Sequence, residues 1–254
     1  MKKIMMILAA LALIAGSASA ALLENWDFEA GDEKSTVTGT TLAGGVNIGH
    51  TVVGGEIVYD RGTGTGASFK SFKDEAYAGA DSGVYQISYD IVAADFALTA
   101  AADGNAQFGF GARFNDGSNK DLNALFRYNG TSDQFQLSLK TAEGNQTVAL
   151  ADGTTIADVN VRQVVDIDAG TYNVWYTIGA GSEQLAYSGA TYADQTIGEF
   201  RQQMQTINGG NNMVAGDTLT MDNITVEAIP EPATIGMLGL GALVTMFVRR
   251  MKNA

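Results

Sequence analysis

Apolar and polar residues alternate in several short stretches of this chain, and this period of two residues restricts the possible folds more than any other feature. The pattern is clearest at residues 85–91, 107–114, 134–140 and 172–178. Successive side chains of a strand point to opposite faces, so alternation is typical of strands with one buried face. We predict strands there and a further strand over Ile197–Ile207, where helical spacing leaves a helix as the alternative.

Turn signals separate these stretches. They are Asp103-Gly104, Asp116-Gly117, Asn129-Gly130 and Asp152-Gly153. Glycine after aspartate or asparagine favours tight turns between antiparallel strands. Glycine is abundant at 31 of 254 residues, whereas proline occurs only twice. The sequence therefore predicts an all-β fold, an antiparallel β-sandwich.

The chain contains no cysteine. Disulfides, thiol catalysis and cysteinyl metal sites are therefore excluded, and stability must come from a hydrophobic core. No internal repeat of about 20–50 residues is visible, which argues against a solenoid or propeller. The length suits one sizeable β domain.

The charge is strongly acidic, with 28 acidic and 15 basic residues and a net charge of −13. Several of the basic residues lie at the two ends, so the middle of the chain is more acidic than the whole. Binding to phosphates requires a cationic surface. We therefore exclude nucleic acid as a partner.

The N-terminus has the three parts of a secretory signal peptide. Lys2 and Lys3 precede the apolar stretch Ile4–Ile14, and Ala18 and Ala20 form a small-residue cleavage site. We predict that signal peptidase cuts before Ala21. Residues 1–20 are thus a signal helix rather than part of the fold.

The C-terminus begins with Pro230, Glu231 and Pro232, which neither a strand nor a helix can continue through. The uncharged run 233–248 follows, and a basic cluster, Arg249/Arg250/Lys252, comes after it. As a helix the run spans about 24 Å, less than the roughly 30 Å of a bilayer core. Basic residues stay on the cytoplasmic side, so the preceding domain faces outward. We expect a transient transmembrane anchor; an ordinary permanent anchor is the alternative.

This C-terminal arrangement resembles the PEP-CTERM sorting signal of Gram-negative bacteria. The resemblance implies recognition by an exosortase, a membrane-embedded cysteine protease that cuts near the proline motif. It further implies export through the inner membrane and delivery to the exopolysaccharide-rich cell surface or extracellular matrix. We accordingly divide the chain into a signal peptide, 1–20, an exported β-sandwich, 21–229, and a sorting signal, 230–254.

The two ends of the exported domain carry a second resemblance. Leu23–Gly31 looks like the opening strand, and Leu219–Val226 like the closing strand, of jelly-roll carbohydrate-binding modules. Lectin-type sandwiches of the concanavalin-like and galactose-binding-like kinds are equally similar. The resemblance implies that the first and last strands lie side by side, with a structural calcium ion close to Asp27, Glu29 and Asp222.

Possible catalytic groups are sparse. Asp166 and Asp168 lie two residues apart and could act as an acid–base pair, but charges that protect an exposed sheet edge explain them better. His50 is the only histidine, and no nucleophile elbow accompanies it. The glycine-rich stretch Arg61–Gly66 lacks the Lys-Ser/Thr of a phosphate loop, so we interpret it as a surface loop.

Aromatic side chains are the better candidates for a binding site, because sugar rings stack on exposed aromatic rings. Trp175 falls on the opposite face from Tyr172, Val174 and Tyr176, so we predict that it lies outside the core and contacts ligand. Three tyrosines close to predicted turns, Tyr59, Tyr77 and Tyr128, are further candidates, with core packing as the alternative.

Three classes of function are compatible with these features. The sequence favours a non-enzymatic cell-surface or matrix protein, for which polysaccharide is a candidate ligand. A lectin with a defined glycan target is the second class. A glycan hydrolase or lyase on the same sandwich is the third, although the sequence contains no catalytic triad and no strand with three alternating acids.

Overall fold

The structure, a computed structural model, describes residues 20–31, 34–37, 39, 49–60, 68–72, 82–96, 105–114, 124–141, 143–190, 197–206 and 216–230. These residues form fourteen strands and no helix. The strands are β1 (Ala21–Trp26), β2 (Gly49–Val53), β3 (Glu56–Asp60), β4 (Ser68–Phe72), β5 (Val84–Asp95), β6 (Asn105–Phe114), β7 (Ala124–Asn129), β8 (Gln134–Thr141), β9 (Gly144–Asp152), β10 (Thr155–Asp166), β11 (Thr171–Ile178), β12 (Gln184–Ala190), β13 (Ile197–Thr206) and β14 (Thr218–Ile229).

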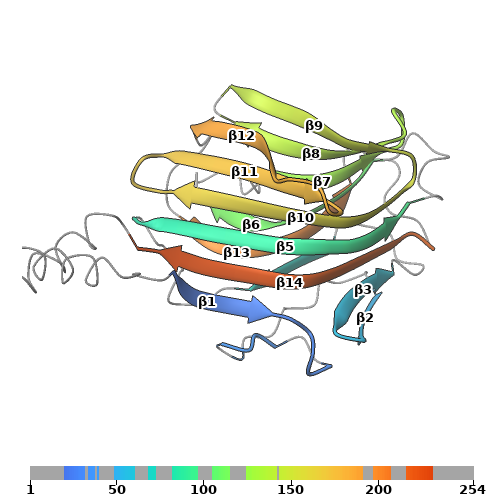
Figure 1. Ribbon diagram of the computed structural model, residues 1–254, viewed down its shortest axis with the longest axis horizontal. Coiled ribbons are helices and arrows are strands. Elements are labelled where there is room, and N and C mark those ends of the chain that lie inside the picture. The colour runs from blue at the N-terminus through green and yellow to red at the C-terminus, as the bar shows by residue number, and fades with distance from the viewer. Residues whose placement is uncertain are drawn as a thin grey trace, which may run out of the picture.

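The strands form two antiparallel sheets. The eight-stranded sheet has the order β12-β11-β10-β5-β14-β3-β2, with β1 also paired to β14. The six-stranded sheet has the order β4-β13-β6-β7-β8-β9. In Figure 1 β6 and β13 lie behind β10, β5 and β14, as expected of two packed layers. The predicted antiparallel β-sandwich is confirmed, and so is the strand predicted over Ile197–Ile207.

The first and last strands lie side by side, as the jelly-roll resemblance implied. β1 pairs with β14 from Ala21 opposite Ala228 to Trp26 opposite Ile224. β14 is an interior strand, because β5 pairs along its other side. The predicted signal-cleavage position, Ala21, therefore sits beside the point where β14 ends and Pro230 begins.

The core fills the space between the sheets. On β5 Ile87, Tyr89 and Ile91 are fully buried, which confirms the face predicted from alternation. Rings from the six-stranded sheet complete it. The ring centroids of Phe135 lie 5.3 Å from Phe126 and 5.1 Å from Tyr128. Such aromatic pairs add to the burial of apolar area in stabilising the sandwich.

Two of the predicted turns are present. The amides of Thr131 and Ser132 donate to the side-chain oxygen of Asn129, which closes the β7–β8 turn. Gly153 joins β9 to β10 with a φ of 95°, a conformation that glycine adopts without strain. The other two turn dipeptides lie outside the described residues.

The predicted helices at both ends of the chain, the signal peptide and the run 233–248, also lie outside the described residues. Within the described ranges no helix is long and apolar enough to cross a membrane.

Candidate functional site

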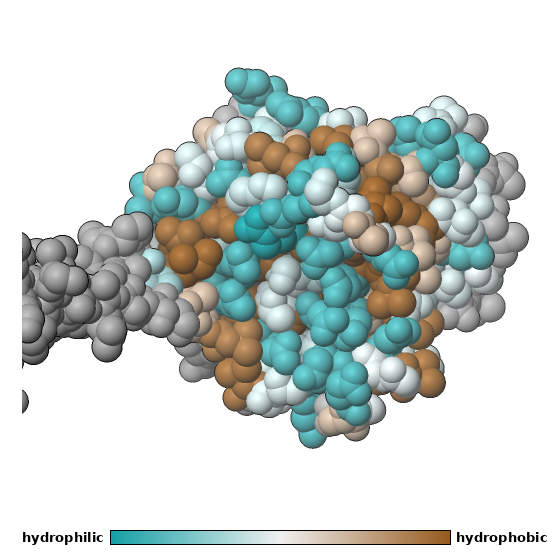
Figure 2. Space-filling view, viewed as in Figure 1, coloured by the Kyte–Doolittle hydropathy of each residue, from teal (hydrophilic) through white to brown (hydrophobic). Residues whose placement is uncertain are grey.

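The outer face of the eight-stranded sheet carries polar side chains across four neighbouring strands. We call it the polar face and define it by Gln86, Ser88, Asp90, Asn160, Arg162, Trp175, Asp222, Asn223, Thr225 and Glu227. Cross-strand pairing aligns them: Arg162 lies opposite both Trp175 and Ser88. Figure 2 shows hydrophilic residues across the centre of this surface and hydrophobic residues toward its sides.

Trp175 lies on this face, half-buried, while Tyr172 and Val174 of the same strand are fully buried. The predicted orientation of Trp175 is therefore confirmed. The guanidinium carbon of Arg162 lies 4.0 Å from the centroid of the indole ring. A cation at this distance is attracted to the ring electrons and holds the indole in place.

Glu183 in turn orients Arg162. The guanidinium donates two hydrogen bonds to the carboxylate, of 2.8 Å and 2.7 Å. These bonds hold the pKa of Glu183 below its usual value. Arg162 also donates to Gln86 at 3.4 Å, which links the indole to the centre of the sheet. A planar bidentate pair of this kind fixes both side chains in one geometry.

Asp90 is the centre of a second network on the polar face. Its two oxygens accept hydrogen bonds from Asn160 at 2.7 Å and from Asn223 at 2.9 Å, so three strands meet at one carboxylate. These residues line a hollow of about 330 Å³ together with Asp158 and Asp222.

Backbone irregularities shape this hollow. The β14–β5 register shifts on both sides of the Asp222–Asp90 pair. Asn223 and Asp158 have positive φ angles of 49° and 54°. Asparagine and aspartate tolerate this left-handed conformation better than other non-glycine residues. The regular pleat is therefore interrupted where the polar groups gather.

Burial and the neighbouring acids Asp90, Glu56 and Glu29 raise the pKa of Asp222, while a hydrogen bond from the amide of Asn223 opposes the shift. Among the described residues no group of three or more acidic or histidine side chains is placed to hold a metal ion. Asp27 accepts hydrogen bonds from the side-chain amide of Asn25 and from the backbone amide of Glu29. Calcium binding by Asp27, Glu29 and Asp222 stays a prediction of the resemblance.

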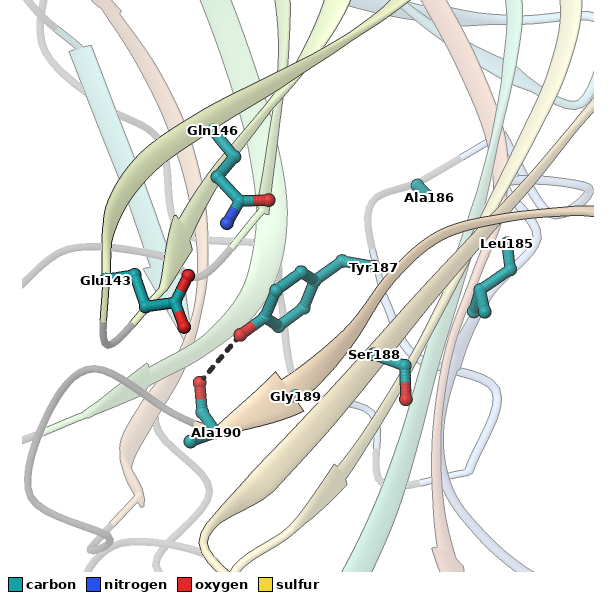
Figure 3. Close-up of a pocket in the computed structure, with 8 residues that line it drawn as sticks. All are labelled: Glu143, Gln146, Leu185, Ala186, Tyr187, Ser188, Gly189 and Ala190. Carbon is teal, nitrogen blue, oxygen red and sulfur yellow. Dashed lines mark hydrogen bonds between the residues drawn. The ribbon is translucent and has the colours of Figure 1, made fainter.

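A larger hollow of about 500 Å³ lies elsewhere, between the two sheets at one side of the sandwich. We call it the edge groove. It is lined by Glu143, Gln146 and residues 185–190. Figure 3 shows the ring of Tyr187 directed toward Glu143 and Gln146, which come from the β8–β9 hairpin.

Two other predicted aromatic candidates, Tyr59 and Tyr128, are buried. Tyr59 is 1% exposed, so its proposed role as a surface contact is wrong: it points into the core from β3. Tyr128 is also fully buried, and its hydroxyl donates to Asp133 at 2.7 Å. Tyr77 lies outside the described residues.

The acidic pair has a structural role different from the one predicted. Asp166 accepts a hydrogen bond from the amide of Ala169, and Asp168 accepts one from the amide of Gly83 at 2.7 Å. β10 pairs with strands on both sides, so the interpretation as protection of an exposed edge is wrong. Asp166 thus closes the turn between β10 and β11, and Asp168 ties this turn to the residue that precedes β5.

His50 lies on β2, half-buried, with its ring centroid 6.0 Å from that of Tyr59. Of the predicted processing residues, Ala20, Ala21 and Pro230 are described; Ala18, Glu231, Pro232, Arg249 and Arg250 lie outside the described residues, as does the loop 61–66.

Sequence reasoning missed Asp90, Asn160, Arg162 and the edge groove. Asp90 and Arg162 occupy polar positions in alternating stretches, which was a usable signal for the outer face. Which of these positions become neighbours depends on the order of strands, because β5 pairs with both β10 and β14.

Several solved structures are similar to this chain. The botulinum neurotoxin serotype G binding domain has a TM-score of 0.49 at 9% identity, with 85% of this chain and 50% of that chain covered. A lectin from Bauhinia forficata in complex with GalNAc has a TM-score of 0.48 at 10% identity, with 83% of this chain and 99% of the lectin chain covered. The carbohydrate-binding module CBM66 from Bacillus subtilis has a TM-score of 0.39 at 13% identity, with 74% of this chain and 96% of that chain covered. This chain thus spans half the length of the neurotoxin chain.

No curated protein matches the sequence. Residues 228–252 match the PEP-CTERM protein-sorting motif, which begins in the last two residues of β14. The chain therefore carries the PEP-CTERM signal of exported Gram-negative proteins that are processed at the membrane, attached directly to an antiparallel β-sandwich.

Proposed function

We propose that this protein is a non-enzymatic component of the cell surface or extracellular matrix that binds polysaccharide through its polar face. Exosortase cleavage after export would release it from its membrane anchor. The observation that supports binding most directly is the pair of fixed side-chain networks, one around Asp90 and one around Trp175, on a single face.

The chemistry of these networks suits a sugar. Carboxylate and amide groups supply the acceptors and donors that sugar hydroxyls require. Asn160 and Asn223 hold Asp90 in one orientation, so little conformational freedom would be lost on binding. Trp175 adds a flat apolar surface, held by Arg162, for the C–H face of a sugar ring.

The charge of the protein narrows the type of polysaccharide. The polar face carries Asp90, Asp222 and Glu227 but only one cation, Arg162, which is already paired with Glu183. An anionic chain would be repelled by this surface and by the net charge of −13. We infer that the ligand is a neutral polysaccharide.

Binding is tested with a panel of soluble neutral and anionic polysaccharides in affinity electrophoresis and calorimetry. We expect wild type to bind at least one neutral member. Trp175→Ala and Asp90→Ala should each weaken binding about tenfold or more, consistent with the loss of a central contact. Thr147→Ala, at an exposed position of β9 in the other sheet, is the matched control and should bind as wild type does. Binding to no member of the panel would refute the proposal.

Processing is tested by intact mass spectrometry of the protein from its native host. We expect a mature chain that begins at Ala21 and ends close to Pro230. The complete β14 would be retained, because Ile229 is paired with Val84 in the sheet. A mature protein that still contains Arg249 and Arg250 would contradict cleavage.

A further inference from the structure

The edge groove lies where both sheets end. β12 is the last strand of the eight-stranded sheet, and β9 is the last strand of the six-stranded sheet. Tyr187 points inward, opposite Val174, whereas the polar face points outward. β12 is three strands away from β5, about 14 Å at the usual strand spacing. Leu185, which lines the groove, pairs with Trp175, so the groove and the polar face adjoin along β11 and β12. They open on different sides of the sheet, because Tyr187 points inward and Trp175 points outward.

Two contacts hold the Tyr187 ring, which forms the aromatic floor of the groove. The hydroxyl of Tyr187 donates a hydrogen bond of 3.1 Å to the carbonyl of Ala190, and the ring centroid lies 4.7 Å from that of Tyr172. Position 189 must be glycine for this arrangement, because a Cβ there would lie 2.5 Å from the Tyr187 hydroxyl oxygen. The local sequence thus positions one ring at the floor of the groove (Figure 3).

Polar groups face this ring from the other sheet. Glu143 and Gln146 are exposed and line the groove opposite Tyr187. Together they offer a carboxylate acceptor, an amide acceptor and amide donors. An aromatic ring with a few convergent polar groups, in a hollow within the usual range of roughly 300–1,000 Å³, is typical of a small-ligand site.

The shape of β12 argues against an added peptide strand as the occupant. The β11–β12 register shifts between Val174 and Trp175, which pair with Tyr187 and Leu185. A bulge bends an edge strand and disfavours pairing with another chain. A compact polar ligand with an apolar face fits the groove better.

We propose that the edge groove is a second glycan-binding site, which takes one or two neutral sugar units, and that each protein molecule binds polysaccharide at two places. This inference takes its ligand class from the proposed function. Two sites on one rigid sandwich would let a single molecule link two polysaccharide chains. Binding to a surface densely covered with polysaccharide would also be strengthened by avidity.

The experiment uses the full chain in mild detergent and an oligosaccharide cut from the neutral polysaccharide that wild type binds most tightly in the panel. Calorimetry gives the number of oligosaccharides bound per chain. We expect two for wild type and one for the double variant Glu143→Ala/Gln146→Ala, with the remaining affinity unchanged. Trp175→Ala should likewise bind one, at the groove. Thr147→Ala, close to the groove but outside its lining, should still bind two.

A second readout is binding to the immobilised parent polysaccharide. The groove double variant should bind at least about tenfold more weakly than wild type, because avidity is lost. Gly189→Ala, which displaces the Tyr187 ring, should have the same effect without removing a polar group. Thermal unfolding confirms that each variant is folded.

The outcomes separate the two proposals. If wild type binds one oligosaccharide, and the groove variants bind it equally well, the groove proposal is wrong while polysaccharide binding stands. If Trp175→Ala removes all binding, the groove proposal is also wrong. If wild type binds no glycan in the panel, both proposals are wrong.

Discussion

The two faces of the eight-stranded sheet have opposite compositions although they belong to the same strands. On β5, for example, Tyr89 is fully buried, whereas the adjacent Ser88 and Asp90 point outward and bond to neighbouring strands. Burial of a large apolar side chain contributes about 1.5–3 kcal/mol, whereas an exposed polar pair contributes about 0–1 kcal/mol. Stability therefore depends mainly on the inner face, and the outer face is free to vary for recognition.

The largest difference between the faces should appear when adjacent residues are truncated. We expect Tyr89→Ala to lower the free energy of unfolding by about 3–5 kcal/mol, because it leaves a cavity at the centre of the core. Ser88→Ala removes only the 2.6 Å hydrogen bond to Thr225 and should cost about 1 kcal/mol. Urea unfolding of both variants measures the difference. Equal losses would mean that the outer network contributes to stability as much as the core.

A smaller effect of the opposite sign is expected at Asp222. Burial and the nearby acids raise its folded pKa, so the folded state binds this proton more tightly than the unfolded state. Its contribution to stability is present below the unfolded pKa of about 3.9 and is lost as pH rises through the folded pKa. Asp222→Asn should therefore stabilise the protein at neutral pH.

This gain in stability should disappear below the normal aspartate pKa, because the Asp222 carboxyl of the wild type is then protonated in both the folded and the unfolded state. Asparagine retains an oxygen that can accept the 2.7 Å hydrogen bond from the amide of Asn223. Urea unfolding at neutral and acidic pH measures the effect. Asp152→Asn, at the exposed end of β9, controls for the change in net charge, because an asparagine oxygen can still accept the hydrogen bond from Gln134. A stability loss at neutral pH would show that the charge of Asp222 is favourable.

The smallest effect on stability should come from Glu183→Gln. The Arg162–Glu183 pair is partly exposed, with side chains 27% and 43% accessible, so we expect a cost of less than about 0.5 kcal/mol that shrinks with added salt. Polysaccharide binding should nevertheless weaken a few-fold, because Arg162 loses the partner that aligns it over Trp175. A stability loss comparable to that of Tyr89→Ala would contradict the division of roles between the two faces.

Much of the fold could be predicted because it depends on local patterns. The alternation at residues 85–91 and 172–178 identified both the strands and their buried faces, including the outward position of Trp175. The PEP-CTERM motif was recognisable because its proline pair, apolar run and basic cluster are contiguous. Tyr59 was misassigned because proximity to a turn does not determine which face of a strand a residue occupies.

The candidate sites could not be predicted in the same way. Asp90, Asn160 and Asn223 are far apart in the sequence and meet only because β5 lies between β10 and β14. The edge groove likewise needs the ends of two different sheets, with Glu143 from one and Tyr187 from the other. Pairing between distant strands is decided by packing of the whole domain.

The sequence by itself determined the secondary structure, the inward and outward faces of its strands, and the sorting signal, because each depends on residues that are neighbours along the chain. The tertiary structure alone decided strand order, the Asp90 network and the groove at Tyr187. These depend on which strands lie side by side, and that choice follows from burying the inner faces of both sheets together in one core.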